Sequence, residues 1–179
     1  LNILIKNKEF EEALKLVEFA YNSGIDAVIV QDLGLAKKIM ELFPKIEVHS
    51  STQMTIYNLD GVKEIEKLGY SRCVLARELS IEEIKNICKN TNIEIEVFIH
   101  GALCICYSGQ CLMSSLIGGR SGNRGSCAGT CRLPYSLLKD GQEKEKGYLL
   151  SSKDVCTLDI LPELIEAGVK SFKIEGRMK

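Results

Sequence analysis

The stretch Gly24–Asp32, GIDAVIVQD, contains the unit that decides the fold: a glycine, a short apolar strand, and polar residues after it. The same order of residue types returns at Gly69–Glu78 (GYSRCVLARE) and at Gly168–Arg177 (GVKSFKIEGR). Short apolar strands that alternate with helices are typical of a parallel sheet covered by helices on both faces. The pattern therefore predicts an α/β protein.

The residues between these units continue the alternation. Apolar periodicity predicts helices over Glu9–Ser23, Leu33–Leu42, Val62–Leu68, Ser80–Asn90 and Asp154–Ala167, the last one broken near Pro162. Ser80 and Glu83 form a capping box at the start of their helix. Strands are predicted at Leu1–Ile5, Ala27–Val30, Ile46–Ser50, Cys73–Ala76, Ile93–Ile99 and Ser171–Ile174.

These strands are too few to close a (β/α)8 barrel, which needs eight strands and about 250 residues. The chain also begins with Leu1, inside a predicted strand, rather than with Met. We therefore predict one partial TIM-like barrel domain over residues 1–179, truncated at its N-terminus, with about six of the eight strands. A doubly wound open sheet is the alternative.

The composition is that of an ordinary globular protein, with 23 basic and 24 acidic side chains and 45% apolar residues. No apolar run approaches the roughly 18 residues of a membrane span, so no membrane partner is expected. The 8 cysteines allow a disulfide framework by their even count. Such frameworks belong to small secreted domains with little core, so a reducing, cytoplasmic setting is favoured.

A Gly- and Cys-rich insertion at residues 101–147 interrupts the alternation before the last strand. Long loops of this kind are usually functional or disordered. Four of its cysteines are candidate metal ligands: Cys104, Cys111, Cys127 and Cys131. Their irregular spacing lacks a C-x2-C pair and favours an iron–sulfur cluster, with structural zinc or unliganded thiols as alternatives. Cys156 is an alternative fourth ligand, and Cys106 is a spare thiol.

Charge around these cysteines has one sign, because no Asp or Glu occurs from Val97 to Lys139. Within GGRSGNRGSC, glycines expose backbone N–H groups beside Arg120 and Arg124. Such a segment suits an anion, either the thiolate cluster itself or the phosphate of a nucleic acid. A flexible loop with solvated arginines is the alternative.

Polar residues collect at the ends of the predicted strands, where α/β barrels place their active sites. The candidates for the catalytic pocket are His49, Glu96, His100, Lys173, Glu175 and Arg177. Glu96 alternates with Phe98 and His100 on one strand face, and a carboxylate there needs a partner such as Lys173 or Arg177. Solvated charges at loop entrances, and purely structural histidines, are the alternatives.

The segments EVFIHGALC (Glu96–Cys104), YSGQC (Tyr107–Cys111) and GRSGNRGSCAGTCRLPY (Gly119–Tyr135) together resemble the collagenase-like peptidases, family thirty-two of the peptidases of unknown catalytic type. LLSSKDVC and SFKIEGRMK match the same family. Its members begin with two more β/α units of a barrel, which agrees with a truncated chain.

The resemblance implies chemistry that the family name does not. Similar proteins hydroxylate the wobble uridine of tRNA or a cytidine of rRNA, and a related pair with [4Fe-4S] clusters hydroxylates ubiquinone without oxygen. By resemblance, Cys104, Cys111 and Cys127 are cluster ligands with Cys131 as the fourth, and prephenate is a possible co-substrate.

The function predicted from these observations is iron–sulfur-dependent tRNA wobble uridine hydroxylation, with tRNA as the partner. A collagenase-like peptidase that uses a metal or a Cys–His pair is the alternative, although no H-E-x-x-H or G-x-S-x-G motif is present. A zinc-stabilised binding module is the second alternative.

Overall fold

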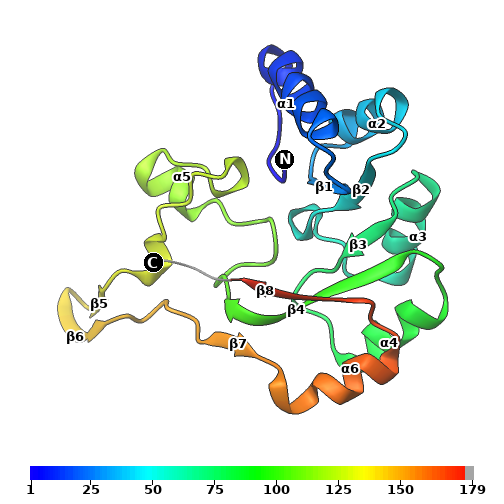
Figure 1. The fold of residues 1–179 in the computed structure, drawn as a ribbon. Helices are drawn as coiled ribbons and strands as arrows, with labels where there is room; N and C mark the ends of the chain where they lie inside the picture. Colours follow the sequence, from blue (N-terminus) through cyan, green and yellow to red (C-terminus); the bar gives the residue numbers. More distant parts are fainter. Residues whose placement is uncertain (176–179) are drawn as a thin grey trace.

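The computed structural model describes residues 1–175, and its centre is a curved, mainly parallel sheet (Figure 1). Its parallel strands run in the order β1 (Ala27–Val30), β2 (Glu47–Ser50), β3 (Arg72–Val74), β4 (Glu94–Ala102) and β8 (Ser171–Glu175). A short strand, β7 (Asp154–Cys156), pairs antiparallel with the end of β4. The predicted α/β class with a parallel sheet is confirmed. The described residues form a half-barrel, and the full eight-stranded barrel stays a prediction.

Helices connect the parallel strands and pack against the sheet. They are α1 (Phe10–Asn22), α2 (Leu33–Leu42), α3 (Leu59–Lys67), α4 (Ile81–Lys89) and α6 (Leu161–Ala167). Local signals set their first turns: Asp32 accepts a hydrogen bond from the Leu35 N–H at 2.9 Å, and Ser80 and Glu83 form the predicted capping box. None of the helices within residues 1–175 is long and apolar enough to cross a membrane.

One face of the sheet forms the hydrophobic core with these helices. Val30 of β1 and Val17 of α1 are both fully buried there. Ile95 and Val97 alternate on β4 toward the same cluster, in which Leu164 of α6 also packs. Burial of such side chains contributes about 1.5–3 kcal/mol each, which makes this face the main source of stability. The other face carries the polar residues described below.

The predicted strand at Leu1–Ile5 is wrong, because this segment pairs with no strand. Its backbone groups bind elsewhere: the Leu4 N–H donates to the carbonyl of Asn123 at 3.2 Å, and the Ile5 N–H donates to Asp32 Oδ2 at 3.4 Å. The apolar pattern reflects packing of Leu1 and Ile5 against the core cluster. The segment therefore links the core to the Cys-rich insertion.

The predicted helix over Asp154–Ala167 is also wrong in its first half. Asp154–Cys156 forms β7, and the helix α6 begins only at Leu161. Pro162 occupies its first turn, where a missing N–H leaves no helical hydrogen bond unmade. The proline thus starts the helix rather than breaking it.

The insertion at residues 101–147 has more regular structure than its glycine content predicts. It contains the short helix α5 (Met113–Gly118), single 3-10 turns, and an exposed hairpin of β5 (Tyr135–Lys139) and β6 (Gln142–Gly147). Figure 1 shows it extending away from α3, α4 and α6, on the other side of β4 and β8. It therefore covers the edge of the sheet that the carboxyl ends of the strands form.

Candidate metal and nucleotide site

A cavity of about 380 Å³ lies between the carboxyl ends of the parallel strands and the insertion. Its sheet side is formed by Ile29 of β1, Ser51 after β2, Arg77 after β3, Phe98 of β4 and Lys173 of β8. Barrel enzymes bind their substrates at this end of the strands. The cavity is therefore the candidate functional site.

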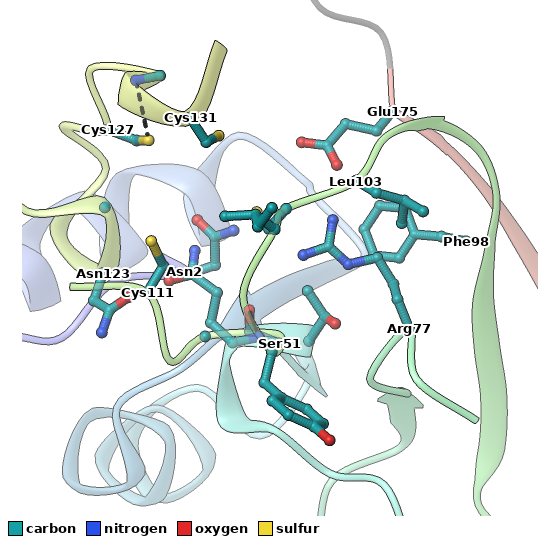
Figure 2. Close-up of a pocket in the computed structure, with 18 of the residues that line it drawn as sticks. Asn2, Ser51, Arg77, Phe98, Leu103, Cys111, Asn123, Cys127, Cys131 and Glu175 are labelled. Carbon is teal, nitrogen blue, oxygen red and sulfur yellow. Dashed lines mark hydrogen bonds between the residues drawn. The ribbon is translucent and has the colours of Figure 1, made fainter. Parts of the chain in front are cut away.

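The four cysteines predicted as ligands all line this cavity, although their loops are separate in sequence. They are Cys104, Cys111, Cys127 and Cys131. Figure 2 shows Cys127 and Cys131 on one segment and Cys111 on another, all at the end of the cavity away from Phe98. Cys106 and Cys156, in contrast, are not among the cavity residues.

All eight cysteines are free thiols, so the disulfide alternative has no support in the structure. Among residues 1–175, no three Cys, His, Asp or Glu side chains are arranged to hold a single metal ion. A four-iron cluster is larger than one ion and binds each thiolate through a different iron atom. Four thiols around one cavity, with no carboxylate contributed by the insertion, form a donor set that fits such a cluster.

One guanidinium holds the loops that carry these thiols. Arg132 donates to the carbonyl of Leu103 at 2.6 Å, to Ser151 Oγ at 2.8 Å and to the carbonyl of Ser152. Its Nη2 also lies 3.9 Å from Asp154 Oδ1. The residue after Leu103 and the residue before Arg132 are both cavity cysteines, so this side chain ties two ligand loops to the start of β7.

Ser108 anchors the insertion to the loop after β3. It is fully buried, and its N–H and Oγ donate to Glu78 Oε1 at 2.9 and 3.2 Å. The Arg77 N–H donates to Ser108 Oγ at 3.2 Å, and Thr55 Oγ1 donates to the Ser108 carbonyl at 2.6 Å. Each of these bonds spans about 30 residues or more in sequence.

Gly109 allows the insertion to approach the loop after β2. A Cβ at this position would lie 2.2 Å from the Gln53 carbonyl oxygen, and its φ is +75°. Neither the space nor the backbone conformation accommodates another residue. Thr55 in the same loop has a φ of +58°, unusual for a β-branched residue, and it is held there by hydrogen bonds to Ser108 and from Gln110.

Glu96 lies buried below the cavity, and Lys173 pairs with it as predicted. Lys173 Nζ is 3.0 Å from Glu96 Oε1, while Ser171 Oγ donates to Oε2 at 2.8 Å and Arg72 Nη1 lies 3.4 Å from Oε2. Burial pushes the pKa of Glu96 upward, but these hydrogen bonds and positive charges outweigh it, so the pKa lies below its usual value. Glu96 is therefore an anionic support that positions Lys173.

Two cations flank the aromatic ring that faces the cavity. Arg77 Cζ and Lys173 Nζ each lie 5.5 Å from the centroid of Phe98. The electron-rich faces of the ring favour both cations. Figure 2 shows Arg77, Phe98 and Glu175 together at the end of the cavity opposite the cysteines. Substrate at this end meets positive charge and the Glu175 carboxylate, and substrate at the other end meets thiols.

The remaining predicted residues lie in different surroundings. His49 is buried and lines neither of the cavities described here. Its Nε2 lies 3.3 Å from Glu47 Oε2, and this hydrogen bond lowers the pKa of Glu47. His100 lines a second, adjoining cavity. Arg177 lies outside the described residues.

Neither predicted anion-binding arginine lines either of the two cavities described here. Arg120 Nε donates to the carbonyl of Ser126 at 3.1 Å within its own loop. Arg124 donates to the Leu4 carbonyl and to Glu9 Oε1, both at 2.6 Å, which fastens the insertion to the beginning of the chain. The described contacts of both arginines are thus to groups of the protein itself, and anion binding by them stays a prediction.

Sequence reasoning missed Arg77 and Arg132 as site residues. Arg77 carried a usable signal, because it directly follows a predicted strand, as the other strand-end residues do. Arg132 carried no such signal, since its contacts with Leu103 and Ser152 depend on how separate loops meet.

Comparison with known proteins agrees with the predicted family. The model of peptidase family U32 matches residues 1–179. The chain is 48% identical over its whole length to a 23S rRNA 5-hydroxycytidine C2501 synthase of Escherichia coli, of which it covers 27%. The chain is 37% identical over 99% of its length to tRNA hydroxylation protein P1 of Bacillus subtilis, and it covers 44% of that protein. It is 33% identical over its whole length to a collagenase of Porphyromonas gingivalis, and it covers 46% of that protein.

The chain thus spans less than half the length of each of these three relatives. The family match extends over every segment that forms the cavity, from Asn2 to the end of β8. The chain belongs to peptidase family U32.

Proposed function

We propose that this chain is part of an enzyme that hydroxylates a pyrimidine base in RNA, with a [4Fe-4S] cluster held by Cys104, Cys111, Cys127 and Cys131. The observation that carries the proposal is the single cavity that these four thiols line at the carboxyl ends of the strands. The similarity to an rRNA hydroxycytidine synthase and a tRNA hydroxylation protein supports an RNA substrate.

The cluster would supply a centre that accepts and donates single electrons beside the substrate. The protein's own residues would then have separate tasks. Arg132 holds two ligand loops in place, and Glu96 fixes Lys173 at the cavity wall. Arg77 and Lys173 would offset negative charge that a phosphate brings to their end of the cavity.

The target base has two candidates. The family resemblance led us to predict the wobble uridine of tRNA, and the tRNA hydroxylation relatives support that prediction. The higher identity, 48% against 37%, favours a cytidine of rRNA instead. Prephenate as a co-substrate stays a prediction from family resemblance.

Anaerobic purification with metal analysis tests the cluster. We expect a brown protein with about four irons and matching sulfide per chain. Serine variants of the four cavity cysteines should lose most of the iron, whereas Cys106→Ser and Cys156→Ser, the matched controls, should keep it. A colourless protein with one zinc would instead favour the zinc-stabilised module.

Nucleoside mass spectrometry tests the substrate. A strain of the source organism that lacks the gene should lose 5-hydroxycytidine from rRNA or 5-hydroxyuridine from tRNA, and the intact gene should restore it. Unchanged levels of both nucleosides would refute RNA hydroxylation.

The family name and the collagenase relative keep a peptidase as the second candidate. Only one Cys–His arrangement stands out in the described sheet, because His100 and Cys156 are opposite each other in the β4–β7 ladder. The first cavity includes neither side chain. Cleavage of collagen or gelatin that Cys156→Ser abolishes would favour this candidate.

A further inference from the structure

A second cavity, of about 540 Å³, adjoins the first along the Cys127–Arg132 segment. Both cavities are lined by Cys127, Gly129, Arg132, Ile174 and Glu175. Its volume lies within the range of about 300–1,000 Å³ that is common for small-molecule pockets. A ligand in this cavity would therefore contact the wall that contains one proposed cluster ligand.

The walls of this second cavity suit a flat ring. Gly101, Ala102 and Ala128 leave room, while Leu133 and Ile174 provide apolar surface. Gly101 is required for this arrangement, because a Cβ there would lie 2.4 Å from the Glu175 carbonyl oxygen. The cavity thus has small residues that leave open space and apolar side chains against which a planar ring can pack.

Two groups able to form hydrogen bonds, Asp154 and Arg132, lie in the wall of this cavity. Asp154 is opposite Ala102 in the β4–β7 ladder, and its side chain is 63% exposed. Arg132 Nη2 lies 3.9 Å from Asp154 Oδ1, and its hydrogen bond to the Leu103 carbonyl uses only one of the two hydrogens on Nη2. A carboxylate acceptor therefore stands next to a guanidinium donor.

Cytosine and uracil differ at the edge that such a pair would meet. Cytosine presents an amino donor beside two acceptors, whereas uracil presents a carbonyl oxygen where cytosine has the amino group. A carboxylate accepts well from the cytosine amino group and repels the uracil oxygen. The neighbouring guanidinium can donate to the ring nitrogen or carbonyl of cytosine.

We propose that the second cavity receives the target base, turned out of the RNA, and that Asp154 selects cytosine over uracil. This inference rests on the proposed RNA hydroxylation and specifies its substrate. Enzymes that modify a base must take it out of the stack, and they recognise it by its Watson–Crick edge. Asp154 is then the specificity-determining residue, and Arg132 both positions the loops and contacts the base.

Binding of short RNAs tests this assignment without turnover. The probes are fluorescein-labelled single strands of adenosine that differ only in one central cytidine or uridine. We expect the full chain to bind the cytidine strand about tenfold more tightly, as measured by fluorescence anisotropy. Asp154→Asn should bring the ratio close to one, because an amide can turn to donate or accept.

Asp159→Asn is the matched control, since it removes the same charge from an exposed position outside both cavities. It should keep the preference for cytidine. Equal binding of both strands by the unaltered protein, or an unchanged ratio in Asp154→Asn, would overturn the inference. The nucleoside analysis described above judges RNA hydroxylation separately, so the two failures are distinguishable.

Discussion

Replacing Glu96 with glutamine tests whether the polar network under the cavity stabilises the fold. The Glu96 side chain is only 7% exposed and interacts with Lys173 at 3.0 Å and Arg72 at 3.4 Å. Removing one partner of a buried ion pair costs about 3–5 kcal/mol. Lys173 and Arg72 remain 30% and 26% exposed, and Arg72 keeps its 2.7 Å pair with Glu94, so part of this cost is offset.

We therefore expect Glu96→Gln to lower the free energy of unfolding by about 2 kcal/mol and the Tm by about 4–8 °C. Urea denaturation followed by circular dichroism measures the first quantity. Glu64→Gln is the matched control, because Glu64 pairs with Lys67 at 2.6 Å but both side chains are about two-thirds exposed. Its effect should stay below about 0.5 kcal/mol.

The effect should also depend on pH in a defined direction. The pKa of Glu96 is lowered in the folded protein, so its stabilisation is complete above the unfolded pKa of about 4.3. The stabilisation is lost as the pH falls through the lower folded pKa. The difference between the two proteins should be constant near neutral pH and shrink in acid. Equal stabilities at pH 7 would refute the buried ion-pair interpretation.

Three further predictions concern the loops and the core. Gly109→Ala should detach the insertion, because the added Cβ would collide with Gln53. Amide hydrogen exchange in residues 101–132 should then become faster. Gly141→Ala, whose added Cβ meets open space, should leave the exchange of those residues unchanged. Arg132→Lys cannot reproduce bonds to three separate oxygens; the iron content should fall at least severalfold, and full iron retention would count against a positioning role. Burial raises the pKa of the Cys73 thiol to about 11, so at pH 8 iodoacetamide should not alkylate Cys73 in the native protein until urea is added. Alkylation of Cys73 as fast as that of the exposed cysteines would contradict the buried environment.

Local signals explain the parts of the fold that sequence reasoning predicted well. The helix at Leu33–Leu42 has the predicted bounds, because its apolar period and the cap at Asp32 lie within the segment itself. The strand Ala27–Val30 is likewise marked by its own run of apolar residues. Such signals need no knowledge of the rest of the chain.

The errors occurred where distant contacts determine the structure. Leu1–Ile5 has the composition of a strand, but its N–H groups bind Asn123 and Asp32. Asp154–Cys156 becomes a strand only because the end of β4 accepts it as a partner. Tertiary pairing overrides propensity in both segments.

The candidate site was predictable in its chemistry but not in its supports. Cysteines gathered in one glycine-rich stretch led us to predict that their thiols meet, and all four, Cys104 and Cys127 among them, do line one cavity; the metal centre itself stays a prediction. The roles of Ser108 and Arg132 arise from contacts across about 30 residues of chain, and no pattern in the adjacent sequence predicts these contacts.

The bonds from Arg124 to Leu4 and Glu9 close loops of 120 and 115 residues. Contacts so distant in sequence form late, because the entropy of loop closure must be overcome first. During synthesis the first strands can pair well before the insertion emerges and docks. The cavity that the four thiols line is therefore completed only at a late stage of folding, and the proposed cluster would be inserted into a nearly finished protein.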